Sequence, residues 1–125
     1  MVAIPGDSQE ERAPLVERAR AQLAFYGSTR NYAFQFDDLG FEGTSARLNE
    51  RMKAGDMEGM SAVITDEIMH HFSVTARWDE MADTLLERYR GVAARLVMYL
   101  AEDSIRADPR ALDRWGEIAR AVTGA

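Results

Sequence analysis

The stretch Trp78–Ala101, WDEMADTLLERYRGVAARLVMYLA, decides the fold class. Its first half repeats apolar side chains every three or four residues, which predicts a helix that ends at Gly91. Residues 92–101 form a short, almost continuous apolar run, which fits either a buried parallel strand or an alanine- and leucine-rich helix. We favour a strand at residues 94–99. Because a lone strand cannot satisfy its own backbone hydrogen bonds, this strand would need a partner.

Outward from this stretch, the sequence predicts helices. Ser8 and Glu11 form a capping-box pattern before a first helix that runs to about Phe25. Pro14 would make this helix begin near Ala13 or kink. Residues 1–7 lack apolar periodicity, so we expect a flexible N-terminus followed by a single helical domain over residues 8–125. Caps and apolar spacing predict further helices at residues 28–40, 45–55, 57–72 and 108–122.

Composition limits the class of protein. The chain has 125 residues, of which 46% are hydrophobic and 29% charged, and a net charge of −6, which is typical of one globular domain and disfavours nucleic acid as a partner. The absence of cysteine excludes disulfides and thiolate metal sites. The longest apolar run is too short to span a membrane, and we find no secretory signal. We therefore expect a cytoplasmic protein without a membrane partner.

Two local patterns could carry chemistry. Gly27, Ser28 and Thr29 offer backbone donors and hydroxyls before a helix, which can hold a phosphate but would equally serve as a helix cap. Glu67 and His70 have the spacing of helical metal ligands, yet this pair occurs once, whereas di-iron bundles need it twice. The two histidines are adjacent and diverge on a helix. We therefore expect no metal site.

Four blocks of the sequence, in order, carry a resemblance to a known family. They are RAQLAFYGSTRNY at residues 20–32, LGF at 39–41, MSAVITDEIMHHFSV at 60–74 and WDEMADTLLERYRGVAARLVMYL at 78–100. Together they resemble the C-terminal part of luciferase-like monooxygenases, and more narrowly the actinobacterial branch that uses a deazaflavin coenzyme. The resemblance covers residues 14–105. Arg30 stands where that family often has proline.

The resemblance implies a mainly α fold that forms the helical C-terminal portion of a (β/α)₈ barrel, with at most one or two strands, at residues 94–99. Residues 14–72 would be the helical insertion after the seventh strand, and 78–90 the helix before the eighth. A whole barrel needs about 250 residues, so the chain alone would lack most of the active site. Tyr26, Ser28, Thr29 and Tyr32 would border the substrate or the coenzyme phosphate, and no catalytic residue can be assigned.

The resemblance also implies the chemistry and the partners. The parent activity would be hydride transfer or monooxygenation with a deazaflavin coenzyme. The partner would be a complementary barrel-encoding chain or a second copy in a homo-oligomer. The alternative hypothesis is a free-standing helical module without catalytic activity, which self-associates through the apolar faces of residues 57–72 and 78–89.

Overall fold

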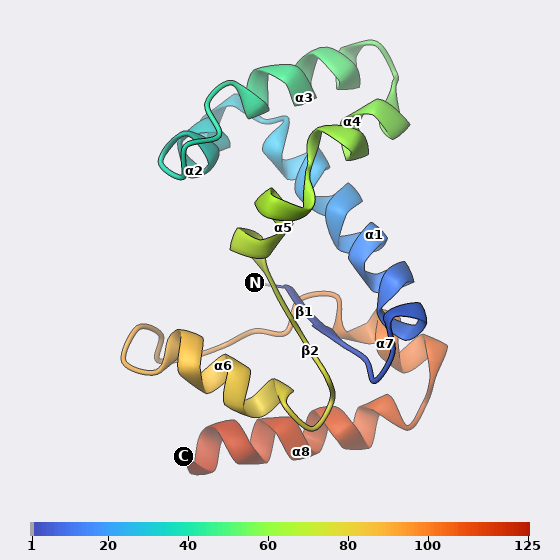
Figure 1. The fold of residues 1–125 in the computed structure, drawn as a ribbon, viewed down its shortest axis with the longest axis vertical. Helices are drawn as coiled ribbons and strands as arrows, with labels where there is room; N and C mark the ends of the chain where they lie inside the picture. The colour runs from blue at the N-terminus through green and yellow to red at the C-terminus, as the bar shows by residue number, and fades with distance from the viewer. Residues whose placement is uncertain (1) are drawn as a thin grey trace. The chain divides into compact units, whose positions relative to one another are not determined.

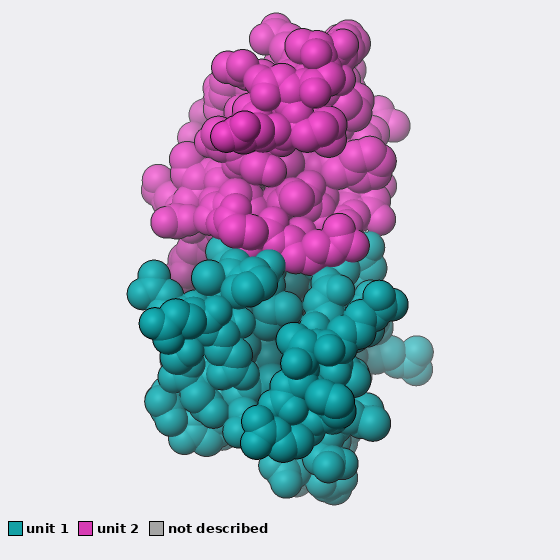
Figure 2. Space-filling view, turned by 90° about the vertical axis from the view of Figure 1, so that its right-hand side faces the viewer, with its two compact units in different colours: residues 1–16, 73–125 teal, residues 17–72 magenta. Residues whose placement is uncertain are grey.

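The computed structural model describes residues 2–125 and is mainly helical, as the sequence predicts (Figure 1). Two compact units divide the chain, one made of residues 1–16 and 73–125 and the other of residues 17–72 (Figure 2). We call them unit 1 and unit 2. The elements are β1 (Val2–Pro5), α1 (Gln9–Gly27), the 3₁₀ helix η1 (Arg30–Tyr32), α2 (Ala33–Asp37), α3 (Thr44–Lys53), α4 (Met57–Val63), α5 (Asp66–Phe72), β2 (Ser73–Ala76), α6 (Met81–Tyr89), α7 (Ala101–Ala107) and α8 (Ala111–Gly124).

The sheet of unit 1 is a parallel pair made of β1 and β2, with Val2 opposite Ser73 and Pro5 opposite Ala76. Residues 2–5 therefore form a strand, where the sequence predicts a flexible terminus over residues 1–7; Met1 lies outside the described residues. The reason is burial: Ala3 and Ile4 are almost completely buried. Four residues are too few to show a period, and Pro5 closes the strand where a missing donor is tolerated.

Residues 94–99 form neither the strand we favoured nor a helix. Tyr99 makes an isolated parallel bridge with Val2, on the edge of β1 that β2 leaves free. Within residues 2–125, the backbone N–H groups of residues 94–98 donate no hydrogen bond to another backbone group. The segment is apolar enough for a strand, but it meets a neighbouring strand at one position only, so no ladder forms.

The core of unit 1 joins the sheet to α6 and α8. The two indole rings of Trp78 and Trp115 meet edge to face, with centroids 5.4 Å apart, and Trp115 Nε1 donates to Ser104 Oγ at 2.8 Å. Both helices are amphipathic, as their apolar spacing predicts. The buried core residues are Ala3, Val74, Trp78, Met81, Leu85, Ala111, Trp115 and Ile118.

In unit 2, the predicted helix over residues 57–72 is broken into α4 and α5. Ile64 is extended, with φ −84° and ψ 95°, and the Thr65 hydroxyl accepts from the N–H of Ile68 at 3.2 Å, which starts the second helix. Arg20, which belongs to α1, stabilises the break between α4 and α5, because its guanidinium donates to the carbonyl of Ile64 and to the Asp66 carboxylate. The apolar spacing alone did not reveal this break, since it continues across it.

The first helix begins where its capping box predicts. Glu11 N donates to Ser8 Oγ at 3.1 Å, and Asp7 N donates to Glu11 Oε2 at 2.8 Å. The helix begins at Gln9, continues through Pro14 and ends at Gly27, two residues later than the predicted end near Phe25. At no point in residues 2–125 does a helix combine the length and the apolar character that crossing a bilayer requires.

Candidate functional site

The four residues implied by the resemblance lie in one turn of unit 2, where α1 ends. Thr29 N donates to the Tyr26 carbonyl at 3.0 Å, and Tyr32 N donates to the Thr29 carbonyl at 2.9 Å. Ser28 is buried, and its hydroxyl donates to the Phe25 carbonyl at 2.7 Å. The structure thus brings the four residues together, but it exposes only Tyr26, Thr29 and Tyr32.

The backbone N–H groups of Ser28 and Thr29 are not available to a phosphate. An anion site at a helix start needs backbone N–H groups that point at the ligand. Here the N–H of Ser28 donates to the Ala24 carbonyl and that of Thr29 to the Tyr26 carbonyl, so both are already used inside the fold. What the turn offers to a ligand is the pair of partly exposed phenol rings of Tyr26 and Tyr32 and the Thr29 hydroxyl.

The histidines lie at the last turn of α5, as expected of imidazoles near a helix C-terminus. The His71 ring contacts the Phe41 ring edge to face, with centroids 5.6 Å apart. Over the described range 2–125, no three histidine, aspartate or glutamate side chains are grouped in a way that could hold a metal ion.

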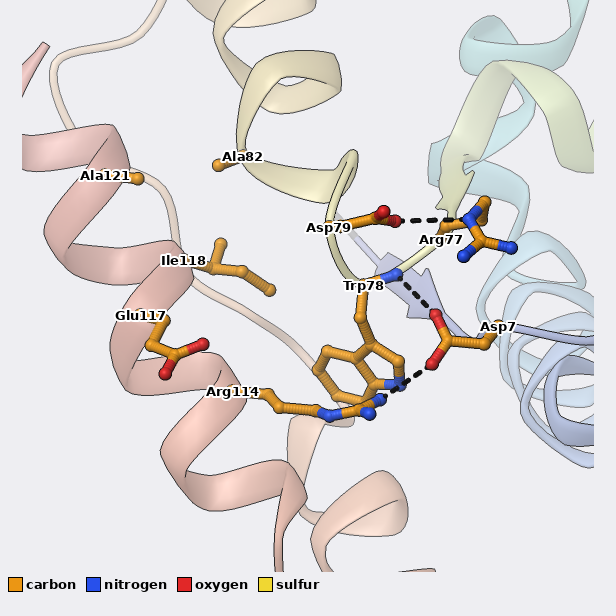
Figure 3. Close-up of a pocket in the computed structure, with 9 residues that line it drawn as sticks. All are labelled: Asp7, Arg77, Trp78, Asp79, Ala82, Arg114, Glu117, Ile118 and Ala121. Carbon is orange, nitrogen blue, oxygen red and sulfur yellow. Dashed lines mark hydrogen bonds and ion pairs between the residues drawn. The ribbon is translucent and has the colours of Figure 1, made fainter.

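A second site lies in unit 1, beyond the carboxyl ends of both strands (Figure 3). Asp7 follows β1, and Arg77, Trp78 and Asp79 follow β2, while α8 supplies the opposite wall. The cavity has a volume of about 380 Å³. Parallel α/β proteins bind their ligands at this end of the strands, because the loops that follow the strands converge there. The lining residues are Asp7, Arg77, Trp78, Asp79, Ala82, Arg114, Glu117, Ile118 and Ala121.

Asp7 ties the walls of this strand-end pocket together. Its carboxylate accepts from Trp78 N at 3.4 Å and from Arg114 Nη1 at 3.1 Å, as the dashed lines of Figure 3 show. The Arg114 guanidinium lies 5.3 Å from the centroid of the Trp78 ring, a cation–π contact. In addition, the indole nitrogen Nε1 of Trp78 donates to Glu11 Oε1 at 2.8 Å. The loop after β1, the loop after β2 and α8 are thereby held in one arrangement.

The charges of the strand-end pocket are mixed. Arg77 Nε pairs with Asp79 Oδ1 at 3.2 Å, and this hydrogen bond and the Asp79 charge raise the pKa of the Arg77 guanidinium. Both arginines keep further N–H donors beyond these bonds. No histidine, serine, threonine or tyrosine lines the cavity. The arrangement of arginines and carboxylates is therefore suited to binding and orienting a charged group.

Sequence reasoning missed the strand-end pocket because it assigned Asp7 to a flexible terminus. A signal was present: VAIP is followed by Gly-Asp, and SVTA by Arg-Trp-Asp. Polar residues directly after two short apolar segments are typical of the loops at strand ends.

The comparisons with known proteins give relatives without a described activity. No protein-family model and no solved structure matches the chain. It is 34% identical, over 97 residues, to uncharacterized proteins of Mycobacterium bovis and of two strains of Mycobacterium tuberculosis. The match covers 78% of this chain but 28% of each relative, so 97 matched residues imply relatives of roughly 350 residues. The chain thus spans about a quarter of the length of these relatives.

Proposed function

We propose that the chain forms the C-terminal part of a luciferase-like, deazaflavin-dependent oxidoreductase and is not catalytically complete by itself. The support from sequence is the ordered set of four blocks between residues 20 and 100. In this reading the chain supplies helical cover and one end of the barrel, while further polypeptide supplies the remaining strands and the reacting groups.

The observation that carries the proposal is the open parallel sheet of unit 1. Parallel strands occur almost only in larger sheets covered on both faces, and a pair of short strands is too small to be stable alone. Here β1 and β2 are four residues each and mostly buried, and among the described residues no strand pairs with the outer edge of β2. The backbone donors of residues 94–98 are also unpaired with other backbone groups of the described chain. Such edges favour additional strands from elsewhere.

The length of the relatives supports the same reading. Proteins of roughly 350 residues fall within the range of (β/α)₈ barrels, about 200 to more than 400 residues. A chain that matches a quarter of such a protein corresponds to about two of its eight strand–helix units. The strand-end pocket then lies on the side where barrels place their active sites.

The coenzyme would be held mainly by the missing part. The backbone N–H groups of Ser28, Thr29 and Tyr32 are used inside the fold, so the contribution that we assign to this turn is the wall formed by Tyr26, Thr29 and Tyr32. When bound, a deazaflavin supplies the hydride chemistry. In this assignment the chain's own residues orient the ligand and exclude water from it.

The alternative, a self-associating helical module, depends on exposed apolar faces. Most of the apolar side chains of these two faces are buried in the described residues, among them Met60, Ile64, Ile68, Met81 and Leu85, and Met57 is 56% exposed. The buried side chains are not available to a second copy.

The test is coenzyme binding by two preparations. The purified chain is titrated with deazaflavin while coenzyme fluorescence is followed, first alone and then after co-expression with the part of a mycobacterial relative that this chain does not match. We expect saturable binding by the pair and none by the chain alone. Saturable micromolar binding by the chain alone would overturn its incompleteness, and a stable pair that fails to bind would overturn the assignment to deazaflavin enzymes.

A further inference from the structure

A larger cavity lies in unit 1 between α6, α8 and the segment 90–98, and it shares Ile118 with the strand-end pocket. Its volume is about 650 Å³, within the range of roughly 300–1,000 Å³ that small-molecule pockets occupy. Its inner wall is apolar and comes from Leu85, Trp115, Ile118 and Val122, with Leu96 and Met98 on the facing segment.

Two arginines give the cavity a positive edge. Arg90 and Arg95 line it, and both are exposed. Within residues 2–125, neither guanidinium pairs with a carboxylate, unlike Arg77 and Arg114 in the strand-end pocket. No aspartate or glutamate side chain lines the cavity, and Ala125, at the C-terminus of the sequence, lines it. The two charges thus adjoin a hydrocarbon-sized space in a protein whose net charge is −6.

We propose that this cavity binds a single-chain amphiphilic anion such as a medium-chain carboxylate. The hydrocarbon chain of the ligand lies against Trp115, Ile118 and Val122, and burial of its apolar surface away from water stabilises the complex. The carboxylate lies between Arg90 and Arg95, whose planar guanidinium groups match its two oxygens. Every residue that forms this binding site belongs to this chain, so it is tested on the isolated chain.

The position of Trp115 provides a direct readout. Of the two tryptophans, Trp115 lines this cavity and Trp78 lines the strand-end pocket. Brominated decanoate, added below its micelle concentration, should quench the tryptophan fluorescence of the whole chain saturably. The Trp115→Phe variant, checked for folding by circular dichroism, should keep only the quenching of Trp78, whose ring lies 5.4 Å from that of Trp115. Absence of saturable quenching in the unaltered chain would overturn the proposal.

The charges are tested by a matched pair of variants. The double variant Arg90→Gln, Arg95→Gln should weaken decanoate binding about tenfold or more, since charge-assisted hydrogen bonds are lost. Arg120→Gln, which removes an exposed α8 arginine outside the cavity, should leave it unchanged. Decanol should bind more weakly than decanoate to the unaltered chain. The proposal would be contradicted if the double variant bound decanoate as tightly as the unaltered chain. It would also be contradicted if the chain bound anionic vesicles but no free decanoate, or if it formed a dimer in gel filtration and bound no decanoate.

Discussion

Gly27 offers the sharpest test of the packing in unit 2. Glycine in AFYGST reads as an interruption of the helix, but in the structure it is the last residue of α1 and is buried. A Cβ at this position would lie 2.7 Å from Phe36 Cζ and 2.9 Å from Leu48 Cδ1. Glycine is therefore present because two side chains pack directly against the backbone.

The cost of Gly27→Ala follows from these distances. Carbon atoms in contact prefer separations of about 3.5–4.0 Å, so Phe36 and Leu48 would have to move by most of an ångström. Both are almost completely buried, and overpacking of this kind costs about 1–3 kcal/mol. Alanine recovers at most about 1 kcal/mol of helix propensity, and less at a helix end. We expect a net loss of about 1–2 kcal/mol of the free energy of unfolding.

The matched control is Gly116→Ala in the middle of α8. A Cβ there would meet only Arg120 Nη1, at 3.4 Å, so the propensity gain of about 0.5–1 kcal/mol should remain and the variant should be stabilised. Urea unfolding followed by far-ultraviolet circular dichroism gives both values. The same substitution should thus have opposite signs at the two sites. A neutral or stabilising Gly27→Ala would refute the close packing of Phe36 and Leu48 on α1.

Three further predictions concern other parts of the chain. Leu85→Ala, at a fully buried core position, should lower the free energy of unfolding by about 2–5 kcal/mol, as measured by urea unfolding. Leu112 is 61% exposed, so Leu112→Ala should change the free energy of unfolding by less than about 0.5 kcal/mol. Equal effects of the two substitutions would contradict the assigned core of unit 1. Gly91→Ala should lower the free energy of unfolding by about 1–2 kcal/mol, because φ is +77° at this position and an L side chain is strained there. No neighbour lies within 4 Å of the added Cβ, so the effect reports the backbone conformation alone. An unchanged melting temperature would rule out this turn. Asp56 caps α4, because its carboxylate accepts a hydrogen bond from Gly59 N. This hydrogen bond, and then the bond from the Arg51 side chain, lower the pKa of the Asp56 carboxyl group. Its contribution to the free energy of unfolding is therefore fully present above the ordinary aspartate pKa of about 4 and is lost as the pH falls through the lower pKa of the folded state. Asp56→Asn keeps the cap and should flatten this acid-side loss of stability, and an unaltered pH profile of the unfolding midpoint would count against the cap.

Local rules predicted the elements whose causes are local. The capping box at Ser8 and Glu11 and the apolar stripe of α6 depend on residues three or four apart, so the sequence shows them directly. The strand at Val2–Pro5 depends on Ser73–Ala76, about seventy residues later. No helix was predicted at α7, of which only Ala101 belongs to the apolar run that we interpreted. The break at Ile64 depends on Arg20 from another helix.

The candidate site shows the same division. The resemblance named Tyr26, Thr29 and Tyr32, which lie in one turn of the structure, but it could not show that the N–H groups of Ser28 and Thr29 are already used inside the fold. The strand-end pocket combines residues 7, 77–79 and 114–121, which only the tertiary fold brings together.

The most direct test of incompleteness is amide hydrogen exchange at residues 94–98. In the isolated chain we expect these amides to exchange quickly, because no backbone acceptor in the described residues holds them. After association with the polypeptide that corresponds to the rest of the mycobacterial relatives, we expect the same amides to become strongly protected as a strand. Strong protection in the isolated monomer, or unchanged exchange in a stable complex, would contradict the account.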